Sequence, residues 1–335
     1  MVNTLPSKGS LAVQQTRLTN TLAPFYSKTA AEPRLTVIGA GAWGSALATV
    51  AMRNNHAVKL WSRRQSEPLA SAIAEADVLL CAVSMKGVPS VIEQIKACNL
   101  PKTKIILTAT KGLDPATKQT PSQMWQAAFP DNPVAVLSGP NLSREIEMGL
   151  PATTVVASQD EAAAKVVQDI FSSETFRVYI NTDPLGTELG GTLKNIMAIA
   201  AGVCDGLNLG TNAKAGLLTR ALPEMMRIGT HMGASSETFF GLSGLGDLLA
   251  TCDGALSRNY RVGFGLAEGK DLETVLIELQ STAEGVNTTR VLVEMARTHR
   301  IPVPIARQVC RLLDHEISPM EAVQALMERE LKAEY

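Results

Sequence analysis

A lysine beside a strongly apolar stretch is the first residue of this chain that could do chemistry. The segment Gly191 to Asn212 reads GTLKNIMAIAAGVCDGLNLGTN, and its residues 196–203 are apolar or glycine on every side of the helix that they predict. This pattern is typical of a helix that is buried all round. Lys194 stands at the beginning of that helix, next to Asn195. Such a lysine either extends to solvent or is a functional amine in a cleft.

A glycine-rich turn near the N-terminus indicates a second kind of chemistry, the binding of a dinucleotide. The apolar run 35–38 enters Gly39-Ala-Gly41-Ala-Trp-Gly44, and a helical stretch and a second strand at 57–61 follow. In a strand–turn–helix unit the three glycines permit a tight turn, the approach of a pyrophosphate and the packing of the helix on the strand. The helix N-terminus then faces the anion. The motif and its spacing predict a nucleotide-binding domain.

The end of the second strand bears on the choice of cofactor. An acidic side chain there would bind the ribose of NAD, but this chain has Ser62-Arg63-Arg64. Two guanidinium groups suit the 2′-phosphate of NADP, so we expect NADP to be preferred over NAD. The alternative is that both arginines are solvated loop charges.

Polar corners follow two of the later apolar runs. The runs 78–83, 105–107, 134–137 and 154–157 predict buried parallel strands, and 176–180 predicts a last strand. Thr110-Lys111-Gly112 and Ser138-Gly139-Pro140-Asn141 stand directly after two of these runs. Ligands of open α/β sheets bind at the carboxyl ends of strands, so we expect Lys111 to face the cleft. A turn lysine in solvent is the alternative.

The pattern becomes helical after Pro184. Asn181-Thr-Asp-Pro184 suits a hinge and an N-cap for the long helix. The predicted helices that follow are 213–229, 235–240, 245–251, 259–267, 271–279, 288–298, 306–315 and 319–332. Two polar turns lie among them, one with Asp247 and one with Ser257-Arg258-Asn259, where serine could cap a helix while Arg258 and backbone amides hold a phosphate. A surface ion pair for Arg258 and a simple cap for Asp247 are the alternatives.

Length and composition agree with a two-domain globular protein. The chain has 335 residues and a formal net charge of −1, which argues against a broad nucleic-acid-binding face. The weakly polar run 195–204 is too short to span a membrane. Five widely spaced cysteines and four scattered histidines predict reduced thiols and no metal site. Residues 1–31 lack Asp and Glu, so we expect a disordered extension over 1–33 of a cytoplasmic protein, or an organelle transit peptide.

Taken together, these motifs resemble those of the bacterial NAD(P)-dependent glycerol-3-phosphate dehydrogenases, from about Leu35 to the C-terminal helices. The segments that carry the resemblance are 191–212, 39–47, 110–112, 244–248, 257–259 and 284–285. It implies an α/β Rossmann-type dinucleotide-binding domain over 34–183 and an all-α substrate-binding domain over 184–335. It also implies interconversion of sn-glycerol 3-phosphate and dihydroxyacetone phosphate with NADP or NAD, without a metal. The product would serve phospholipid synthesis, and a homodimer is compatible with this family.

The resemblance, with the glycine turn, assigns roles to individual residues. The catalytic residues are Lys194, as the proton acceptor in oxidation, with Lys111 and Asp247 lining the reacting centre. The substrate-binding residues are Lys111, Gly139, Asn141, Lys194, Asn195, Asp247, Ser257, Arg258 and Asn259. The cofactor-binding residues are Gly39, Gly41, Ala42, Trp43, Gly44, Arg63, Arg64, Lys111, Ser143, Arg258, Thr282 and Glu284.

The base needs help from its surroundings, because a free lysine titrates near roughly 10.4. Burial of Lys194 and the positive charge of Lys111 would lower its pKa, whereas Asp247 would raise it. Two departures from the family pattern affect the binding sites. A long segment is missing between Arg64 and Ala76, which puts a helix and a strand in doubt, and Asn141-Leu142-Ser143 replaces the family's Thr-Phe-Ala.

Two other functions remain open at this point. The nearest is a related dehydrogenase with a dinucleotide domain and a helical domain, acting on a β-hydroxyacid or a ketopantoate-like substrate. A protein that binds NADP(H) as a sensor, without catalysis, would keep the glycine turn but would not need Lys194 and a phosphate-binding turn.

Overall fold

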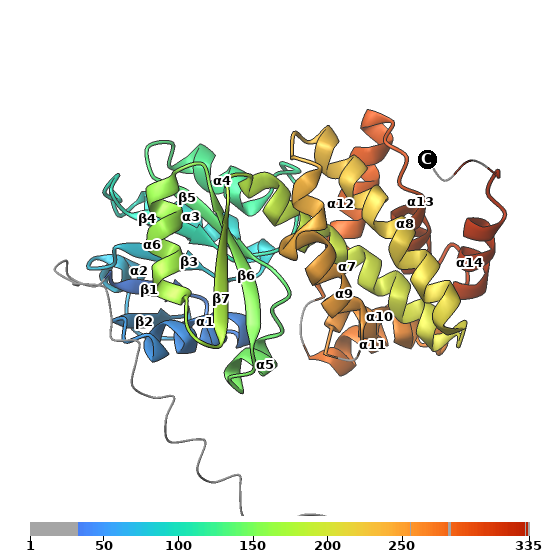
Figure 1. Ribbon diagram of the computed structural model, residues 1–335, viewed down its shortest axis with the longest axis horizontal. Coiled ribbons are helices and arrows are strands. Elements are labelled where there is room, and N and C mark those ends of the chain that lie inside the picture. Colours follow the sequence, from blue (N-terminus) through green and yellow to red (C-terminus); the bar gives the residue numbers. More distant parts are fainter. Residues whose placement is uncertain (1–32, 255, 281–282, 332, 334–335) are drawn as a thin grey trace, which may run out of the picture. The chain divides into compact units, whose positions relative to one another are not determined.

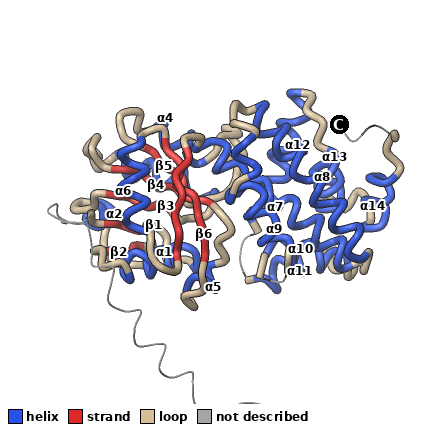
Figure 2. The backbone as a smooth tube through the Cα atoms, in the orientation of Figure 1, coloured by secondary structure: helices blue, strands red, loops and turns tan. Residues whose placement is uncertain are grey.

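A computed structural model describes residues 33–254, 256–280, 283–331 and 333 of the chain. The predicted extension, except Pro33, and the predicted cofactor residue Thr282 lie outside this described part. Residues 33–335 form one unit by their contacts. All its strands lie in one half, together with the helices that cover them, and the other half consists of helices (Figure 1, Figure 2).

A seven-stranded sheet forms the first half, in the order β2-β1-β3-β4-β5-β6-β7. β1 to β5 are parallel to one another, and β7 is parallel to β6. The strands are β1 (Leu35–Ile38), β2 (Val58–Trp61), β3 (Val78–Cys81), β4 (Ile105–Thr108), β5 (Val134–Ser138), β6 (Ala152–Ser158) and β7 (Phe176–Asn181). All the strands predicted from the apolar runs are present.

The predicted direction of the run 154–157 was wrong, because β6 pairs antiparallel with β5. The connection between these strands contains a single helix of five residues, α5 (Ser143–Glu147). A parallel connection must carry the chain from the carboxyl end of one strand back to the level of its amino end. A helix of about 7.5 Å is too short for that.

Helices cover both faces of the sheet. α1 (Ala42–Arg53) and α6 (Glu161–Phe171) share one hydrophobic cluster with strand residues such as Val37 and Leu80. α2 (Leu69–Ile73), α3 (Val88–Lys96) and α4 (Pro121–Ala128) share another with Ile38 and Leu79. Successive strand residues therefore pack on opposite faces, which explains why these strands are continuous apolar runs. The missing segment after Arg64 leaves a short α2, whereas β3 is intact.

The long helix α7 (Pro184–Gly206) leads into the helical half and packs against its neighbours there and against β5. Asp183 caps it, accepting a hydrogen bond from the Gly186 amide, as predicted for this hinge. The helix therefore begins ten residues before Lys194, and the predicted position of that lysine at its beginning was wrong. Gly190 and Gly191 hid the first turns, because glycine is a poor helix former.

The other helices surround α7, and their hydrophobic side chains form one core with it. They are α8 (Gly210–His231), α9 (Asp247–Cys252), α10 (Arg258–Ala267), α11 (Leu272–Leu279), α12 (Glu284–His299), α13 (Pro304–Leu313) and α14 (Pro319–Met327). Two predicted helices are in part other turns, a 3₁₀ turn at Glu237–Phe240 and a π turn at Leu242–Gly246. α14 ends at Met327, earlier than predicted.

Candidate active site

The glycine turn has the conformation that a dinucleotide pyrophosphate requires. Gly39 has a φ of 119°, which favours glycine, and a Cβ on Gly44 would collide with the Gly39 carbonyl. A Cβ on Gly41 would meet no atom within 4 Å, so the space in front of this residue is open. Gly41 caps α1 without a side-chain hydrogen bond, which leaves the amides of the first helical turn available to an anion. These residues fit the cofactor.

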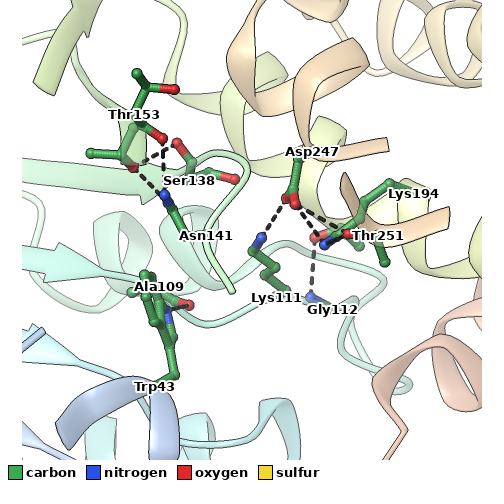
Figure 3. A network of polar contacts seen from close by, with 12 residues as sticks. Trp43, Ala109, Lys111, Gly112, Ser138, Asn141, Thr153, Lys194, Asp247 and Thr251 are labelled. Atoms are coloured by element: carbon green, nitrogen blue, oxygen red, sulfur yellow. Dashed lines mark hydrogen bonds and ion pairs between the residues drawn. The ribbon is translucent and has the colours of Figure 1, made fainter. Parts of the chain in front are cut away.

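Two residues of the turn that were predicted to bind the cofactor lie at the start of α1. Ala42 is exposed, and the Trp43 indole donates a hydrogen bond of 3.2 Å to the carbonyl oxygen of Ala109. Ala109 directly follows β4, so this bond connects the glycine turn to the corner that carries Lys111 (Figure 3).

Three charged side chains from distant parts of the chain meet at the centre of the site (Figure 3). The Lys194 Nζ lies 2.7 Å from Oδ1 of Asp247, and the Lys111 Nζ lies 2.5 Å from Oδ2 of the same carboxylate. Lys194 also donates a hydrogen bond to the hydroxyl of Thr251. The side chains of Lys194, Lys111 and Asp247 are 9%, 20% and 2% exposed. Lys111 is thus the member of the cluster that is most open to solvent.

Each member of this cluster is held by a different element. Lys194 lies midway along α7, Lys111 follows β4, and Asp247 is the first residue of α9. The π turn before α9 approaches α7 closely, because a Cβ on Gly190 would lie 2.6 Å from the Ser243 carbonyl oxygen. This close approach brings the Asp247 carboxylate to the lysine.

Burial lowers the pKa of Lys194 to about 8, and the positive charge of Lys111 acts in the same direction. The negative charge of Asp247 opposes both effects. A lysine of this kind can accept or donate a proton near neutral pH, which suits a general acid or base.

The second polar turn lies where α7, α10 and α12 meet. Ser257 caps α10 by accepting a hydrogen bond from the Tyr260 amide, and Asn259 is buried and accepts one of 3.0 Å from the Gly285 amide. A Cβ on Gly285 would lie 2.6 Å from the Asn259 Oδ1 and 2.8 Å from the carbonyl oxygen of Asn195. Arg258 is exposed and forms no ion pair with any described residue. Its guanidinium is therefore available to a ligand.

Other predicted substrate residues turn toward the sheet instead. The Asn141 amide donates to the Thr153 carbonyl at 2.9 Å and accepts from the Thr154 hydroxyl at 2.8 Å. Gly139 has a φ of 156° and packs against the same strand, since a Cβ there would lie 3.0 Å from the Thr154 Cα. Nearby, Ser143, which was predicted to bind the cofactor, begins α5 and is partly exposed. No hydrogen bond within the described chain joins these three residues to the lysine cluster.

The other residues predicted to bind the cofactor lie on separate elements. Arg63 and Arg64 follow β2, are exposed, and form no ion pair within the described residues. Glu284 begins α12 and accepts a hydrogen bond of 3.4 Å from the Met85 amide, which follows β3. Burial raises the pKa of Glu284, and the charge of Arg258 counteracts part of that effect.

Thr251 belongs to the site but was not predicted from the sequence. Its hydroxyl contacts both the Lys194 Nζ and the Asp247 Oδ1. The sequence spacing could have indicated it, because Thr251 stands four residues after Asp247 and therefore lies on the same face of α9.

The described residues contain no group of three or more His, Cys, Asp or Glu side chains that could hold a metal ion. None of the described helices is long and apolar enough to cross a membrane.

Two features define the class of protein: an open glycine turn after a parallel strand, and a buried lysine that is paired with a carboxylate in the helical half. Together they are typical of an NAD(P)-dependent dehydrogenase with a nucleotide-binding domain and a helical domain. Comparison with known families agrees with this class and narrows it. The model of the NAD-dependent glycerol-3-phosphate dehydrogenase C-terminus matches residues 183–324, and that of the N-terminus matches residues 34–68 and 64–164. The chain belongs to the NAD-dependent glycerol-3-phosphate dehydrogenase family.

Individual relatives match over nearly their full length. A glycerol-3-phosphate dehydrogenase [NAD(P)+] of Synechocystis is 62% identical over 90% of this chain and 96% of its own. One of Trichormus variabilis is 58% identical over 91% and 99%. The crystal structure of glycerol-3-phosphate dehydrogenase from Coxiella burnetii has a TM-score of 0.84 and 34% identity, over 89% of this chain and 99% of that one. The two matches to the N-terminal model meet at residues 64–68, where the sequence lacks the family's long segment.

Proposed function

We propose that this chain interconverts sn-glycerol 3-phosphate and dihydroxyacetone phosphate with NAD(P), with Lys194 as the general acid and base. The observation that carries the proposal is the buried Lys194 ammonium, 2.7 Å from Asp247 and beside Lys111, with its pKa lowered to about 8. A ketone oxygen that becomes an alkoxide needs both a proton donor and a positive charge, and this cluster offers both.

In the reducing direction, protonated Lys194 donates its proton to the ketone oxygen of dihydroxyacetone phosphate. Lys111 stabilises the negative charge that develops on that oxygen, and Asp247 holds both ammonium groups in place. When bound, the nicotinamide ring supplies the hydride or accepts it. In the oxidising direction, neutral Lys194 takes the proton of the secondary hydroxyl.

The substrate phosphate would bind at the turn before α10. Arg258 offers an exposed guanidinium there, and Ser257, Asn259 and the first amides of α10 lie beside it. Anchoring the phosphate orients the remote carbonyl toward Lys194. Asn195, Gly139 and Asn141 are proposed to complete this site, although the Asn141 amide also holds β6.

The test is to follow the absorbance of NADPH, and then of NADH, in the presence of dihydroxyacetone phosphate. We expect rapid oxidation of the nicotinamide with this substrate and none with ketopantoate or with the carbonyl form of a β-hydroxyacid. A preference for a carboxylate substrate would contradict the proposal and favour the related class of dehydrogenase. Lys194→Ala should lower turnover by orders of magnitude with nearly unchanged cofactor affinity, and near-normal turnover would disprove the role of this lysine.

We propose further that NADP is preferred over NAD, because Arg63 and Arg64 are exposed directly after β2 and no acidic residue stands there. The cofactor would also contact Ala42, Trp43, Ser143 and Glu284, and Thr282 beyond the described residues. Replacing Arg63 and Arg64 together by alanine should raise the KM for NADPH and leave that for NADH unchanged. Arg297→Ala, which removes an exposed arginine of α12, is the control.

Five broader expectations complete the proposal. The enzyme is proposed to be a metal-independent cytoplasmic homodimer that supplies glycerol 3-phosphate for phospholipid synthesis, with import into an organelle as the alternative location. The domain boundary is proposed at residues 183–184, between β7 and α7. Light scattering after gel filtration tests the dimer, activity after dialysis against a chelator tests the metal, and the N-terminus of the protein isolated from its own cells tests import.

A further inference from the structure

Helix α7 holds both ends of the segment that carries Lys111. This segment, residues 111–122, follows β4 and runs into the first turn of α4. At its first end, the Gly112 amide donates a hydrogen bond of 3.1 Å to the Thr192 hydroxyl. At its other end, the Ser122 amide lies 3.0 Å and 3.1 Å from the two carboxylate oxygens of Glu188, and the Ser122 hydroxyl donates at 2.5 Å. Thr192 and Glu188 are four residues apart, so they lie on one face of α7.

These contacts are shielded from water. Thr192 is 0% and Glu188 2% exposed, and Leu113, which follows Gly112, is packed in the core formed around α7. Glu188 also lies at the N-terminus of α4, where the free amides of the first turn favour a carboxylate. Burial nevertheless raises the pKa of Glu188 to about 7. Burying a charged carboxylate costs free energy, so Glu188 is a poor choice for a contact that only stabilises the fold. We therefore infer that it has a role beyond stability.

We propose that Thr192 and Glu188 are positioning residues that hold Lys111 against Asp247 and beside Lys194. Lys111 directly precedes Gly112, whose amide donates to the Thr192 hydroxyl. Lys194 stands two residues after Thr192 on the same helix. One helix thus sets the separation between the two lysines. The inference deepens the proposed function and rests on the roles given there to Lys111 and Lys194.

The charged and titratable groups that act on Lys194 are Asp247, Lys111 and Cys252. Of these, only Lys111 is carried by the segment that Thr192 and Glu188 fasten. If the segment moves away, the positive charge near Lys194 weakens and the pKa of Lys194 rises. A residue with a merely structural role would lower stability without moving this pKa.

The chain supplies a matched control in Glu224. This carboxylate is also 2% exposed and also binds the N-terminus of a helix, accepting hydrogen bonds of 2.9 Å from the amides of Ile305 and Ala306 at the start of α13. It lies on α8 and contacts neither lysine of the cluster. Glu224→Gln therefore disturbs a similar buried cap away from the reacting centre.

The experiment compares Thr192→Val, Glu188→Gln and Glu224→Gln with the parent enzyme in the reduction of dihydroxyacetone phosphate across pH, after thermal unfolding has shown that each is folded. We expect Thr192→Val and Glu188→Gln to lower kcat about tenfold at pH 7, through loss of a positioned charge. The alkaline limb of kcat/KM should move up by roughly one pH unit, because a more distant Lys111 lowers the pKa of Lys194 less. Thr192→Ser, which keeps the hydroxyl, should restore both, and Glu224→Gln should change stability alone.

Parent-like pH limbs in both Thr192→Val and Glu188→Gln would overturn the inference. A readout without turnover separates this outcome from failure of the proposed function. The amide of Gly112 should exchange its hydrogen faster in Thr192→Val than in Glu224→Gln, whatever reaction the enzyme catalyses. An exchange rate equal to that of the parent would also overturn the positioning role.

Discussion

Replacing Lys194 by methionine should abolish turnover and yet leave the folded state at least as stable as the parent at pH 7. Lys194 is buried, and its pKa is lowered from 10.5 to about 8. A pKa difference of that size corresponds to about 3 kcal/mol, since one unit is about 1.4 kcal/mol. At pH 7 the folded protein carries this cost to keep the amine protonated, whereas methionine has a similar length and no charge. Asp247 keeps Lys111 as its partner in the variant.

The dependence on pH gives the sharper test. Between about pH 8 and pH 10.5 the unfolded chain holds a proton on Lys194 that the folded chain has released. The free energy of unfolding of the parent therefore rises with pH across this window, and the contribution of Lys194 is least favourable below pH 8. The methionine variant lacks this term. Its stability advantage over the parent should be largest at pH 7 and smaller by about 2–3 kcal/mol at pH 10.

Urea unfolding of both proteins at pH 7 and at pH 10 measures this difference, and the titrating groups that lie far from Lys194 cancel in the comparison. The reasoning is refuted if the two proteins lose stability in parallel between pH 10 and pH 7. It is refuted equally if the variant is less stable than the parent by the same amount at both pH values, because that would make the lysine a simple stabilising ion pair.

Three further predictions follow from the site. The rate of dihydroxyacetone phosphate reduction should decline above about pH 8, because Lys194 loses its proton there. The rate of glycerol 3-phosphate oxidation should rise over the same pH range. If kcat/KM for the two directions changed at clearly different pH values, a single acid–base group would be contradicted. Arg258→Ala should raise the KM for dihydroxyacetone phosphate at least about tenfold and change kcat less, because a phosphate anchor mainly supplies binding and orientation; steady-state kinetics would expose the error if kcat fell alone. Gly191→Ala should lose most of the activity, because its Cβ would collide with the Ser138 hydroxyl and lie 3.2 Å from Cε of Lys111. The control, Gly216→Ala, should remain fully active, because no atom lies within 4 Å of its Cβ.

Much of the sheet could be predicted because its physical signals are local. Runs such as 78–83 and 105–107 are apolar without alternation, as strands buried on both faces must be, and the glycine turn stands between a strand and a helix. Lys194 could be singled out because it stands beside an apolar helix, and Lys111 because it follows a strand of the sheet. The role of Asp247 came from the family resemblance. The distances among these three residues depend on the packing of α7, β4 and α9, which no local pattern contains.

The features that escaped prediction are those that a local pattern cannot encode. An apolar run has no direction, so β6 could not be distinguished from a parallel strand. The position of Lys194 along α7 was predicted wrongly, because Gly190 and Gly191 disfavour helices in isolation, although they permit close packing here. The hydrogen bond from the Asn141 amide to the neighbouring strand was not predicted, and the role expected for Asn141 at the substrate stays a prediction.

The burial of α7 limits how a new substrate range could evolve or be engineered in this protein. From Gly186 to Cys204 every residue except Ala200 is buried. Gly190 and Gly202 meet other backbones, Thr192 and Glu188 hold the Lys111 segment, and the apolar side chains of the helix belong to the core. Almost any replacement on this helix would therefore alter stability and catalysis together. Substitutions are more readily accepted in the turn before α10, where Asp253 and Leu256 are exposed, and in the turn after β5, where Asn141 and Leu142 are half-buried.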